Sequence, residues 1–345
     1  MKIIDATTPS AADVVRRSAA EVDGPLRAAI ALLPAQLRSG AGFHLGWWDA
    51  DGNTGSHACG KMLRPAFALT SARAVSGHAG SAAVRAGVAV ELVHNFSLVH
   101  DDVMDVDEVR RGRPTVWAEF GVPYAILLGD AMLALASQVL ARGGDTVAAG
   151  LCGELNDVVV ALCLGQHLDM VFEGRGSIST DDYLEMVAGK TSALLAGACA
   201  LGGLAGGADI TQLAALREFG HQIGLAFQLV DDVLGIWGDP VVTGKPAGAD
   251  LQRYKKSMPV VAAMGSGTSA GEELAEMYEK RAITGGRDLA RAVHLVERSG
   301  AREWTESRAR THHRLAVESL DGMTADPTAL DDLRALAGLM VDRNR

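Results

Sequence analysis

Residues 86–105 of the chain read "AGVAVELVHNFSLVHDDVMD". Apolar residues at three- and four-residue spacing lead into an acidic end, which predicts a buried helix that finishes in carboxylates. Asp101 and Asp105 are four residues apart, so they lie on one face of this helix with Asp102 beside them. Two carboxylates about 4 Å apart repel by about 4 kcal/mol at an effective dielectric of 20. A cation between them would remove the repulsion, so this helix end is a candidate metal site.

A second segment repeats the pattern. The stretch "FQLVDDVLG" at 227–235 also places an aspartate pair, Asp231 and Asp232, after apolar helical sequence. One such motif alone is more often a solvated helix end, but the repetition favours a functional reading. Ligand sets made only of oxygen suit Mg²⁺, which proteins share between one or two carboxylates and substrate phosphates. No histidine–cysteine cluster with zinc spacing stands near either pair.

Basic residues accompany both acidic segments. They are Lys61 and Arg64 in "GKMLRP", Arg110 and Arg111 after the first motif, Lys190 with Thr191 in "GKTSALL", and Lys245 in "TGKP". Acids for a metal and bases for an anion, attached to apolar helices, indicate a phosphorylated substrate with a hydrophobic tail. The sequence contains no Walker-type phosphate loop and no GxSxG nucleophile motif. Metal-assisted diphosphate chemistry is the reading that remains.

The composition excludes several classes of protein. The chain has 345 residues and a net charge of −10, which argues against nucleic-acid binding. The four cysteines stand apart with no CxxC spacing, which favours a reducing cytoplasm. The N-terminus lacks the pattern of a signal peptide. The longest small apolar stretch, "ALLAGACALGGLAGGA", has sixteen residues and is short for a membrane span, so we expect a soluble protein.

Helical periodicity joined by glycine turns predicts an all-α, single-domain bundle over residues 1–345. No convincing period-2 strand appears. Residues 1–24 are expected to be loosely ordered at the start of one helix over 1–37, residues 38–60 to form a loop, residues 239–256 to form a polar loop, and 321–345 to form a C-terminal helix or tail. The other expected helices cover 67–77, 81–105, 123–142, 145–173, 180–204, 209–237, 257–264, 270–281, 285–299 and 301–320.

Taken together, these motifs resemble the trans-isoprenyl diphosphate synthases, or polyprenyl synthetases, and in particular the actinobacterial geranylgeranyl and farnesyl diphosphate synthases. The resemblance covers about residues 25–320. Its segments occur in the family's order and are "GKMLRP", "ELVHNFSLVHDDVMDVDEVRRGRPT", "GKTSALL", "GHQIGLAFQLVDDVLGIWGD" and "TGKPAGADLQRYKKSMPVV". It implies a cytoplasmic all-α homodimer of the isoprenoid synthase type, with a deep central cavity. It also implies head-to-tail condensation of isopentenyl diphosphate with an allylic diphosphate.

The resemblance also assigns roles to residues of this chain. Three magnesium ions would bind to Asp101, Asp102 and Asp105 on one side and to Asp231 and Asp232 on the other. The allylic diphosphate would be bound by Arg110, Lys190, Thr191, Gln228 and Lys245. The diphosphate of isopentenyl diphosphate would be bound by Lys61, Arg64, His94 and Arg111. Phe96 and Ser97, beneath the first motif, would set the product length, and we expect geranylgeranyl diphosphate, then farnesyl diphosphate.

One position departs from the family's pattern. The second motif usually ends in a third aspartate, but this chain has Gly235 there, and Asp239 is the next carboxylate along the helix. This departure motivates an alternative, a noncatalytic or modulating subunit. A class I terpene cyclase is a further alternative, although "NDVVVALCL" from Asn156 lacks the serine and glutamate of the second metal motif of such cyclases.

Overall fold

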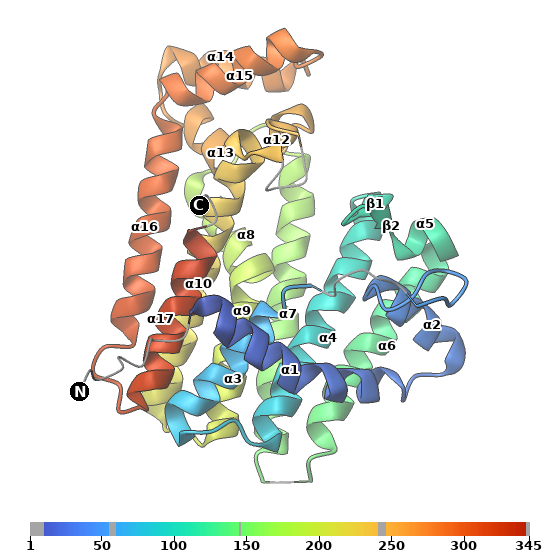
Figure 1. Ribbon diagram of the computed structural model, residues 1–345. Coiled ribbons are helices and arrows are strands. Elements are labelled where there is room, and N and C mark those ends of the chain that lie inside the picture. Colours follow the sequence, from blue (N-terminus) through green and yellow to red (C-terminus); the bar gives the residue numbers. More distant parts are fainter. Residues whose placement is uncertain (1–9, 55–59, 145, 241–245, 343–345) are drawn as a thin grey trace, which may run out of the picture. The chain divides into compact units, whose positions relative to one another are not determined.

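The computed structural model describes residues 10–54, 60–144, 146–240 and 246–342, and helices dominate them (Figure 1). The all-α expectation is confirmed. The helices are α1 Ala11–Ile30, α2 Ala35–His44, α3 Leu63–Ser76, α4 Ser81–Met104, α5 Val116–Phe120, α6 Val122–Ala141, α7 Ala148–Glu173, α8 Thr180–Val187, the π-helix η1 Ala188–Ser192, α9 Ala193–Gly206, α10 Ile210–Trp237, α12 Ala249–Gln252, α13 Met258–Met264, α14 Ser269–Glu279, α15 Gly286–Arg298, α16 Ala301–Ser319 and α17 Pro327–Val341.

The N-terminal region differs from the expectation of one helix over 1–37. Ser10 and Asp13 form a capping box that starts α1 at Ala11, so residues 11–24 are helical. Pro34 separates α1 from α2, because proline disfavours a helical residue before it. The chain then continues as α2 to His44, inside the region expected to be a loop. Residues 1–9 lie outside the described part of the chain.

A short hairpin is the other difference from the sequence-based expectation. Strands β1 (Val109–Arg110) and β2 (Arg113–Pro114) pair antiparallel around Arg111 and Gly112. Both turn residues have positive φ, 52° and 73°, which is the two-residue turn whose twist matches a hairpin. The strands are too short to show a period of two in the sequence.

The helices form two compact units, which are described separately. The first comprises residues 1–159, 197–217 and 322–336, and the second residues 160–196, 218–321 and 337–345. Whether these two units together behave as one domain is not tested by this division, so the single domain over residues 1–345 stays a prediction.

In the first unit α4 packs along α3 and α6 (Figure 1). Its face toward the core is fully buried at Leu92 and Val99. Glycine makes the close approach to α6 possible, since a Cβ on Gly129 would lie 2.1 Å from Nε2 of His100. His100 also contacts the carbonyl oxygen of Ile126 at 3.0 Å, so α4 and α6 are fixed in register.

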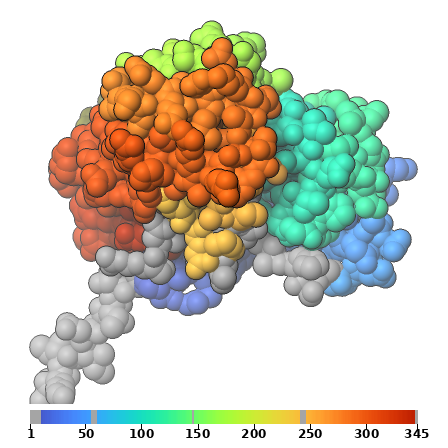
Figure 2. Space-filling view, turned by 90° about the horizontal axis from the view of Figure 1, so that it is seen from above, coloured from blue at the N-terminus to red at the C-terminus, as the bar shows by residue number. Residues whose placement is uncertain are grey.

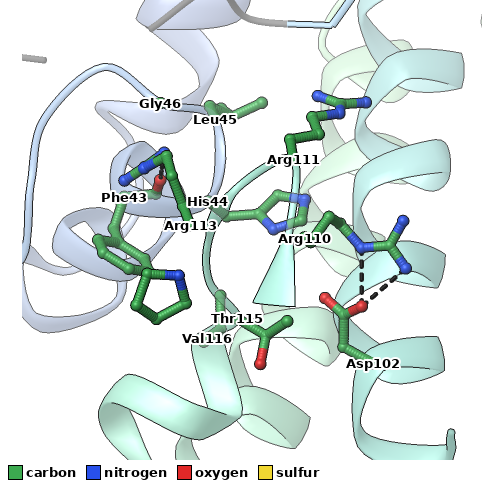
Figure 3. A pocket seen from close by; sticks show the side chains of 11 residues that line it. Phe43, His44, Leu45, Gly46, Asp102, Arg110, Arg111, Arg113, Thr115 and Val116 are labelled. Carbon is green, nitrogen blue, oxygen red and sulfur yellow. Dashed lines mark hydrogen bonds and ion pairs between the residues drawn. The ribbon is translucent and has the colours of Figure 1, made fainter. Parts of the chain in front are cut away.

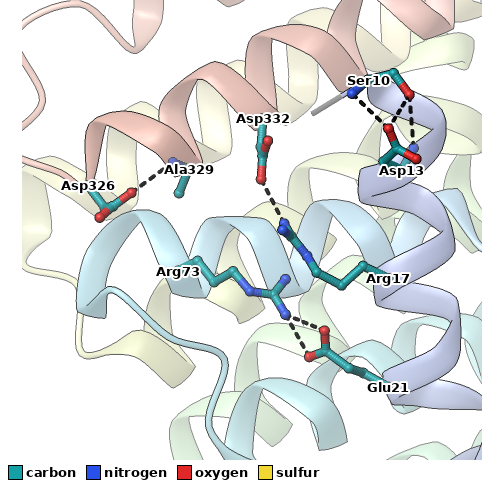
Figure 4. Close-up of polar contacts among 8 residues, drawn as sticks. All are labelled: Ser10, Asp13, Arg17, Glu21, Arg73, Asp326, Ala329 and Asp332. Carbon is teal, nitrogen blue, oxygen red and sulfur yellow. Dashed lines mark hydrogen bonds and ion pairs between the residues drawn. The ribbon is translucent and has the colours of Figure 1, made fainter. Parts of the chain in front are cut away.

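Ion pairs fasten three helices of this unit to one another (Figure 4). Arg17 of α1 donates to Asp332 of α17 at 2.7 Å, and Asp332 is 2% exposed. One turn further along α1, Glu21 accepts from Arg73 of α3 at 2.6 Å. A buried carboxylate needs such a partner to remain charged. The N-terminal helix and the start of the C-terminal helix are thus held in the same unit.

In the second unit one hydrophobic core joins the C-terminal end of α10 to the short helix α12 and to α13, α14 and α15. Fully buried members include Leu251, Val260 and Leu274. Helices α14 and α15 lie across the end of α16, and their side chains form one continuous surface in the space-filling view (Figures 1 and 2). The predicted helices at 270–281, 285–299 and 301–320 are confirmed within two residues at each end.

Four helical stretches are long and apolar enough to cross a membrane by length and composition, namely Ser81–Met104, Val122–Ala141, Ala148–Glu173 and Thr180–Gly206. The last contains most of the sixteen-residue stretch considered above and runs for 27 residues, so shortness does not exclude it. Within the most apolar 18 residues of each stretch, 72% of the first stretch and 67% of the last are buried inside the protein. The other two, α6 and α7, are less than half buried.

Candidate active site

The first aspartate motif lies at the C-terminal end of α4. The helix ends at Met104, and the N–H of Asp105 donates to the carbonyl oxygen of Asp101 at 2.8 Å. Asp101 is half-buried and Asp105 is exposed, whereas Asp102 is only 1% exposed. The negative end of the helix dipole makes this position unfavourable for carboxylates, so the motif depends on nearby positive charge.

Arg110 of the hairpin supplies such charge to Asp102. Its Nε and Nη2 each donate to Oδ1 of Asp102 at 2.7 Å, and Figure 3 shows both bonds. Burial raises the pKa of Asp102, while the bonds and charge of Arg110 lower it. The other oxygen, Oδ2, is buried and has no hydrogen-bond partner within the described residues.

The hairpin closes a small pocket beside Asp102 (Figure 3). This pocket has a volume of about 160 Å³ and is lined by the end of α2 together with Arg110, Arg111 and Arg113. His44 also lines it and contacts Oδ1 of Asn95 at 3.1 Å. Burial, together with Arg110 and Arg111, lowers the pKa of His44 to about 3. The imidazole is therefore neutral at physiological pH, and the pocket carries the positive charge of the arginines.

Three of the four residues predicted to bind isopentenyl diphosphate interact electrostatically in the first unit. Burial lowers the pKa of His94 well below its usual value, and the charges of Arg64 and Arg111 lower it further. A Cβ on Gly60 would lie 3.0 Å from Nη2 of Arg111, so the guanidinium lies close to the backbone at Gly60. The fourth predicted residue, Lys61, is exposed directly after Gly60. The arrangement forms a cationic surface with a neutral imidazole that can donate one hydrogen bond.

The second aspartate motif lies near the end of α10. Asp231 is half-buried and Asp232 is 1% exposed, so the two pairs share one pattern of burial. Oδ2 of Asp232 accepts hydrogen bonds from the hydroxyl of Tyr183 and from the N–H of Met258, the latter at 2.9 Å. Oδ1 accepts from Nε2 of Gln228 at 3.0 Å. Burial raises the pKa of Asp232 to about 6, although these donors and Lys255 oppose the shift.

The π-helix η1 presents Lys190 and Thr191, two of the predicted diphosphate ligands. A π-turn inserts an extra residue into a helix and often occurs at functional sites. Glycine lets the surrounding backbone approach, since a Cβ on Gly165 of α7 would lie 2.0 Å from the nitrogen of Lys190. Lys190 donates to Asp169 at 2.5 Å, and Thr191 donates to Oε1 of Gln228 at 2.8 Å. Lys190, Thr191 and Gln228 are therefore brought together, while Lys245 lies outside the described residues.

A carboxylate occupies the space that Gly235 leaves open in the second motif. A Cβ at this position would lie 2.1 Å from Oδ2 of Asp250, a residue of α12. The carboxylate beside the missing third aspartate is thus that of Asp250, whereas Asp239 follows the end of α10. The spacing of a motif along one helix could not reveal a group that comes from another element.

Four residues near the second motif have no role that the sequence indicates, namely Asp169, Tyr183, Asp250 and Lys255. Desolvation lowers the pKa of Lys255, but Asp232, Asp250, Asp169 and Asp231 together raise it above its usual value. Lys255 is thus a fixed positive charge among these carboxylates. The pair Lys255–Lys256 was visible in the sequence as a basic cluster, but nothing there indicated its partners.

The predicted chain-length residues lie on α4 below the first motif. Phe96 is 5% exposed, and its ring meets that of His100 edge to face with centroids 5.7 Å apart. His100 rests against Gly129, so Phe96 is supported from the side of α6. Ser97 is 9% exposed and donates to the carbonyl oxygen of His94 at 2.8 Å.

The donor atoms fit magnesium better than a metal that needs a complete protein cage. Among the described residues, no group of three or more histidine, cysteine, aspartate or glutamate side chains is close enough to hold a metal ion alone. Magnesium tolerates this, because it keeps several waters and takes its other ligands from substrate phosphates. Asp101 and Asp105 offer carboxylate oxygens at an accessible helix end. The two motifs are therefore suited to a metal that binds together with a diphosphate.

Comparison with known proteins agrees with this chemistry. Residues 52–296 match the model of the polyprenyl synthetase family. The chain belongs to the polyprenyl synthetase family. A geranylgeranyl diphosphate synthase of Mycobacterium tuberculosis is 45% identical over 96% of this chain and 93% of that protein. A (2E,6E)-farnesyl diphosphate synthase of Mycobacterium bovis is 41% identical over 90% of this chain and 87% of that protein.

The fold agrees as well. The crystal structure of a polyprenyl synthetase from Streptomyces coelicolor A3(2) superposes with a TM-score of 0.91 at 43% identity, covering 95% of this chain and 98% of the other. The chain is accordingly a transferase, a trans-prenyltransferase with the isoprenoid synthase fold. Prenyl synthases use isopentenyl diphosphate and an allylic diphosphate as substrates, and the family is generally magnesium-dependent.

Proposed function

We propose that this polyprenyl synthetase makes geranylgeranyl diphosphate, with farnesyl diphosphate as the second candidate product. One observation carries the site assignment. Each of two helix ends carries an aspartate pair whose first member is accessible. Beside each pair lies a cationic or polar side chain that can bind an anion, Arg110 at the first and Gln228 at the second. The product assignment rests on similarity, because the 45% identical relative is a geranylgeranyl diphosphate synthase and the 41% identical relative is a farnesyl diphosphate synthase.

The anion-binding side chains divide between the two substrates. Lys190, Thr191 and Gln228 bind the allylic diphosphate together with Arg110 and Lys245. Arg64, His94 and Arg111 bind the diphosphate of isopentenyl diphosphate together with Lys61. Guanidinium and ammonium groups suit this task, since they give charge-assisted hydrogen bonds to phosphate oxygens. The neutral imidazole of His94 donates one hydrogen bond and adds no charge.

The aspartates of both motifs would hold magnesium, three ions in all, together with the allylic diphosphate. When bound, magnesium stabilises the negative charge that develops on the departing diphosphate. The allylic carbon then accepts the electron pair of the isopentenyl double bond, and a proton leaves to the released diphosphate. Arg110 and Lys190 are held before the reaction by Asp102 and Asp169, so these two groups need little reorganisation as charge develops. Apolar residues around Phe96 keep water away from the growing chain.

The protein works as a cytoplasmic homodimer without a membrane span. Helix α6 exposes Val122, Ile126 and Leu127, and α7 exposes Val160 and Leu164, with four-residue spacing on each helix. Apolar stripes of this kind mark surfaces that another chain covers. Cys152, Cys163 and Cys199 are free thiols, as a reducing cytoplasm allows.

The dimer is tested by light scattering after size exclusion. Leu127→Glu should shift the protein toward monomer, because a charge would be buried in the interface. Ile210→Glu is the control, since Ile210 is 86% exposed and lies outside both stripes. A parent protein that is already monomeric contradicts the dimer.

The activity is tested with purified protein, Mg²⁺, isopentenyl diphosphate and, in turn, dimethylallyl, geranyl or farnesyl diphosphate. We expect incorporation of isopentenyl units and a twenty-carbon product. Cyclic hydrocarbons without incorporation would indicate a terpene cyclase. No product from any primer would indicate a noncatalytic or modulating subunit, and adding a second prenyl synthase would then test for modulation.

A further inference from the structure

The π-helix η1 carries three consecutive polar side chains, and each one bonds to a neighbouring helix. Lys190 donates to Asp169 of α7, and Thr191 donates to Gln228 of α10. Lys190 and Thr191 are proposed ligands of the allylic diphosphate. The third side chain, Ser192, is 0% exposed, so its role lies inside the protein.

Ser192 is bonded to His221 of α10 through two contacts. Its hydroxyl donates to the carbonyl oxygen of His221 at 2.6 Å, and Nδ1 of the imidazole lies 2.9 Å from the same hydroxyl oxygen. The hydroxyl has one proton, which the carbonyl accepts, so Nδ1 is the donor of the second hydrogen bond. A serine inside a helix often bonds to the carbonyl four residues back along its own helix, whereas Ser192 bonds across to α10.

His221 lies on the face of α10 that meets the π-helix. It precedes Gln228 by seven residues, which is two helical turns, so the two side chains point to the same side of α10. Gly224 lies between them, and a Cβ there would be 2.4 Å from Cα of Ser192. The backbones of α10 and η1 are therefore in contact at this point. His221 and Gln228 bond to η1 on either side of this contact.

The π-turn determines where Lys190 and Thr191 point. The N–H of Ala193 donates to the carbonyl oxygen of Ala188, five residues back, so this turn contains one residue more than an α-turn. An α-helix turns by about 100° per residue. If the extra residue were absorbed into α-geometry, the two sides of the helix would rotate against each other by that angle, and both diphosphate ligands would lose their present direction.

We propose that Ser192 and His221 are positioning residues for the allylic diphosphate: the bonded pair holds the π-turn in register, so that Lys190 and Thr191 face the substrate. This inference rests on the proposed function, in which those two residues bind the diphosphate, and it deepens that function. Ser192 and His221 act through the π-turn, without contact to the substrate or the metal. Outer groups that orient metal ligands change affinity by about 10–100-fold when they are removed, and we expect the lower end of that range here.

The first test separates the hydrogen bond from the side-chain volume at position 221. His221→Leu removes the donor, whereas His221→Asn keeps one, because the amide nitrogen of asparagine takes the position of Nδ1. In steady-state kinetics, His221→Leu should raise KM for the allylic diphosphate by about 10-fold, and His221→Asn should raise it by less than about 3-fold. KM for isopentenyl diphosphate should change by less than about 3-fold in both. Equal losses in the two variants would overturn the proposal, and so would an equal rise of both KM values.

Ser192→Ala tests the other member of the pair. It removes both hydrogen bonds, so KM for the allylic diphosphate should rise at least as much as in His221→Leu. Adding His221→Leu to Ser192→Ala should then have little further effect, because the two changes remove one shared interaction. Fully additive effects would contradict the role assigned to the pair. Ser18→Ala is the matched control and should keep the parent KM, since Ser18 is equally buried and lies on α1.

Calorimetric titration of the full-length protein with inorganic diphosphate and Mg²⁺ supplies a readout without turnover. Ser192→Ala should weaken diphosphate binding by about 10-fold, because two ligands lose their orientation. An affinity equal to that of the parent would overturn the proposal. His221→Leu covers the case in which Ser192→Ala does not fold, since His221 is only partly buried. A parent protein that neither binds diphosphate with Mg²⁺ nor elongates a primer would instead refute the proposed function.

Discussion

The C-terminal ends of α4 and α10 each contain a buried carboxylate, and different groups stabilise it at the two ends. Both present an accessible aspartate followed by a buried one. At α4 the buried carboxylate is paired with a guanidinium, whereas at α10 it is held by a phenol, an amide and a backbone N–H. At α4 the positive charge is hydrogen-bonded directly to the carboxylate, whereas at α10 the hydrogen-bond donors are neutral and the positive charge of Lys255 acts beside them. The two ends should therefore respond differently to pH and to substitution.

The accessible aspartates should show the largest effects, and here the two ends should behave alike. Asp101→Ala and Asp231→Ala should each lower kcat at least the roughly 10²–10³-fold typical of one electrostatic contributor. The measurement is elongation of farnesyl diphosphate at saturating Mg²⁺. Asp107→Ala is the control, because Asp107 follows the first motif without an assigned role. Near-normal turnover in either variant would show that the corresponding helix end is only surface.

The buried aspartate of α10 should make stability depend on pH. Its pKa is 3.8 when unfolded and about 6 when folded, so the folded state favours the protonated form. The stabilisation is complete below pH 3.8 and is lost as pH rises through about 6, a total of about 3 kcal/mol. About 1 kcal/mol of this stabilisation is lost between pH 5 and 8. Over that range the free energy of unfolding of Asp232→Asn should therefore decrease less than that of the parent protein.

Denaturant unfolding without metal, at a series of pH values, measures this difference. Asp102→Asn is the matched variant at the other helix end, where Arg110 offsets part of the effect of burial. Identical pH profiles for the parent and Asp232→Asn would mean that the carboxylate is not held as a costly buried charge.

The third position of the motif sharpens the comparison further. The first motif has an exposed Asp105, whereas the second has Gly235 beside Asp250. Gly235→Ala should destabilise the protein by about 1–3 kcal/mol, because the added Cβ meets the Asp250 carboxylate. Asp250→Gly in the same chain should recover most of this loss in thermal unfolding. Full stability of the Gly235→Ala single variant would show that Asp250 is free to move aside.

The smallest expected change in free energy is the one that alters product length. Only residues at the α4 end should control this length. Phe96→Ala should lengthen the products, since it removes a bulky ring below the first motif. Chain length is read by chromatography of the dephosphorylated products. Ile223→Ala, a buried change on α10, controls for general loosening of the core. Unchanged products from Phe96→Ala would remove Phe96 from the chain-length role.

Local patterns predicted most of the fold. The buried positions of α4 and α10 have helical spacing throughout, and α10 begins within one residue of the expected position. The apolar period continues across the N-terminal break between α1 and α2, and in the sequence only Pro34 marks that break. The hairpin was missed because two-residue strands leave no period, and only the Arg111–Gly112 turn indicates it.

The aspartate pairs and most of their cations were also predictable, because metal and phosphate chemistry restricts the residue types. Burial within each pair was encoded too, since Asp102 and Asp232 continue the buried faces of their helices. The side chains that contact the buried aspartates could not be read from local sequence patterns. Tyr183, Asp250 and Lys255 reach the second motif from α8, α12 and the segment after α12, and only tertiary packing brings them there.

The left-handed backbone of Arg111 has a consequence for anyone who engineers this enzyme. A non-glycine residue pays about 1–2 kcal/mol in that conformation, and asparagine or glycine would suit the turn better. A screen for heat resistance would therefore select replacements at 111 that remove a guanidinium facing the predicted isopentenyl diphosphate site. Thermostable libraries of this protein should keep position 111 fixed, or they will enrich for folded proteins with little activity.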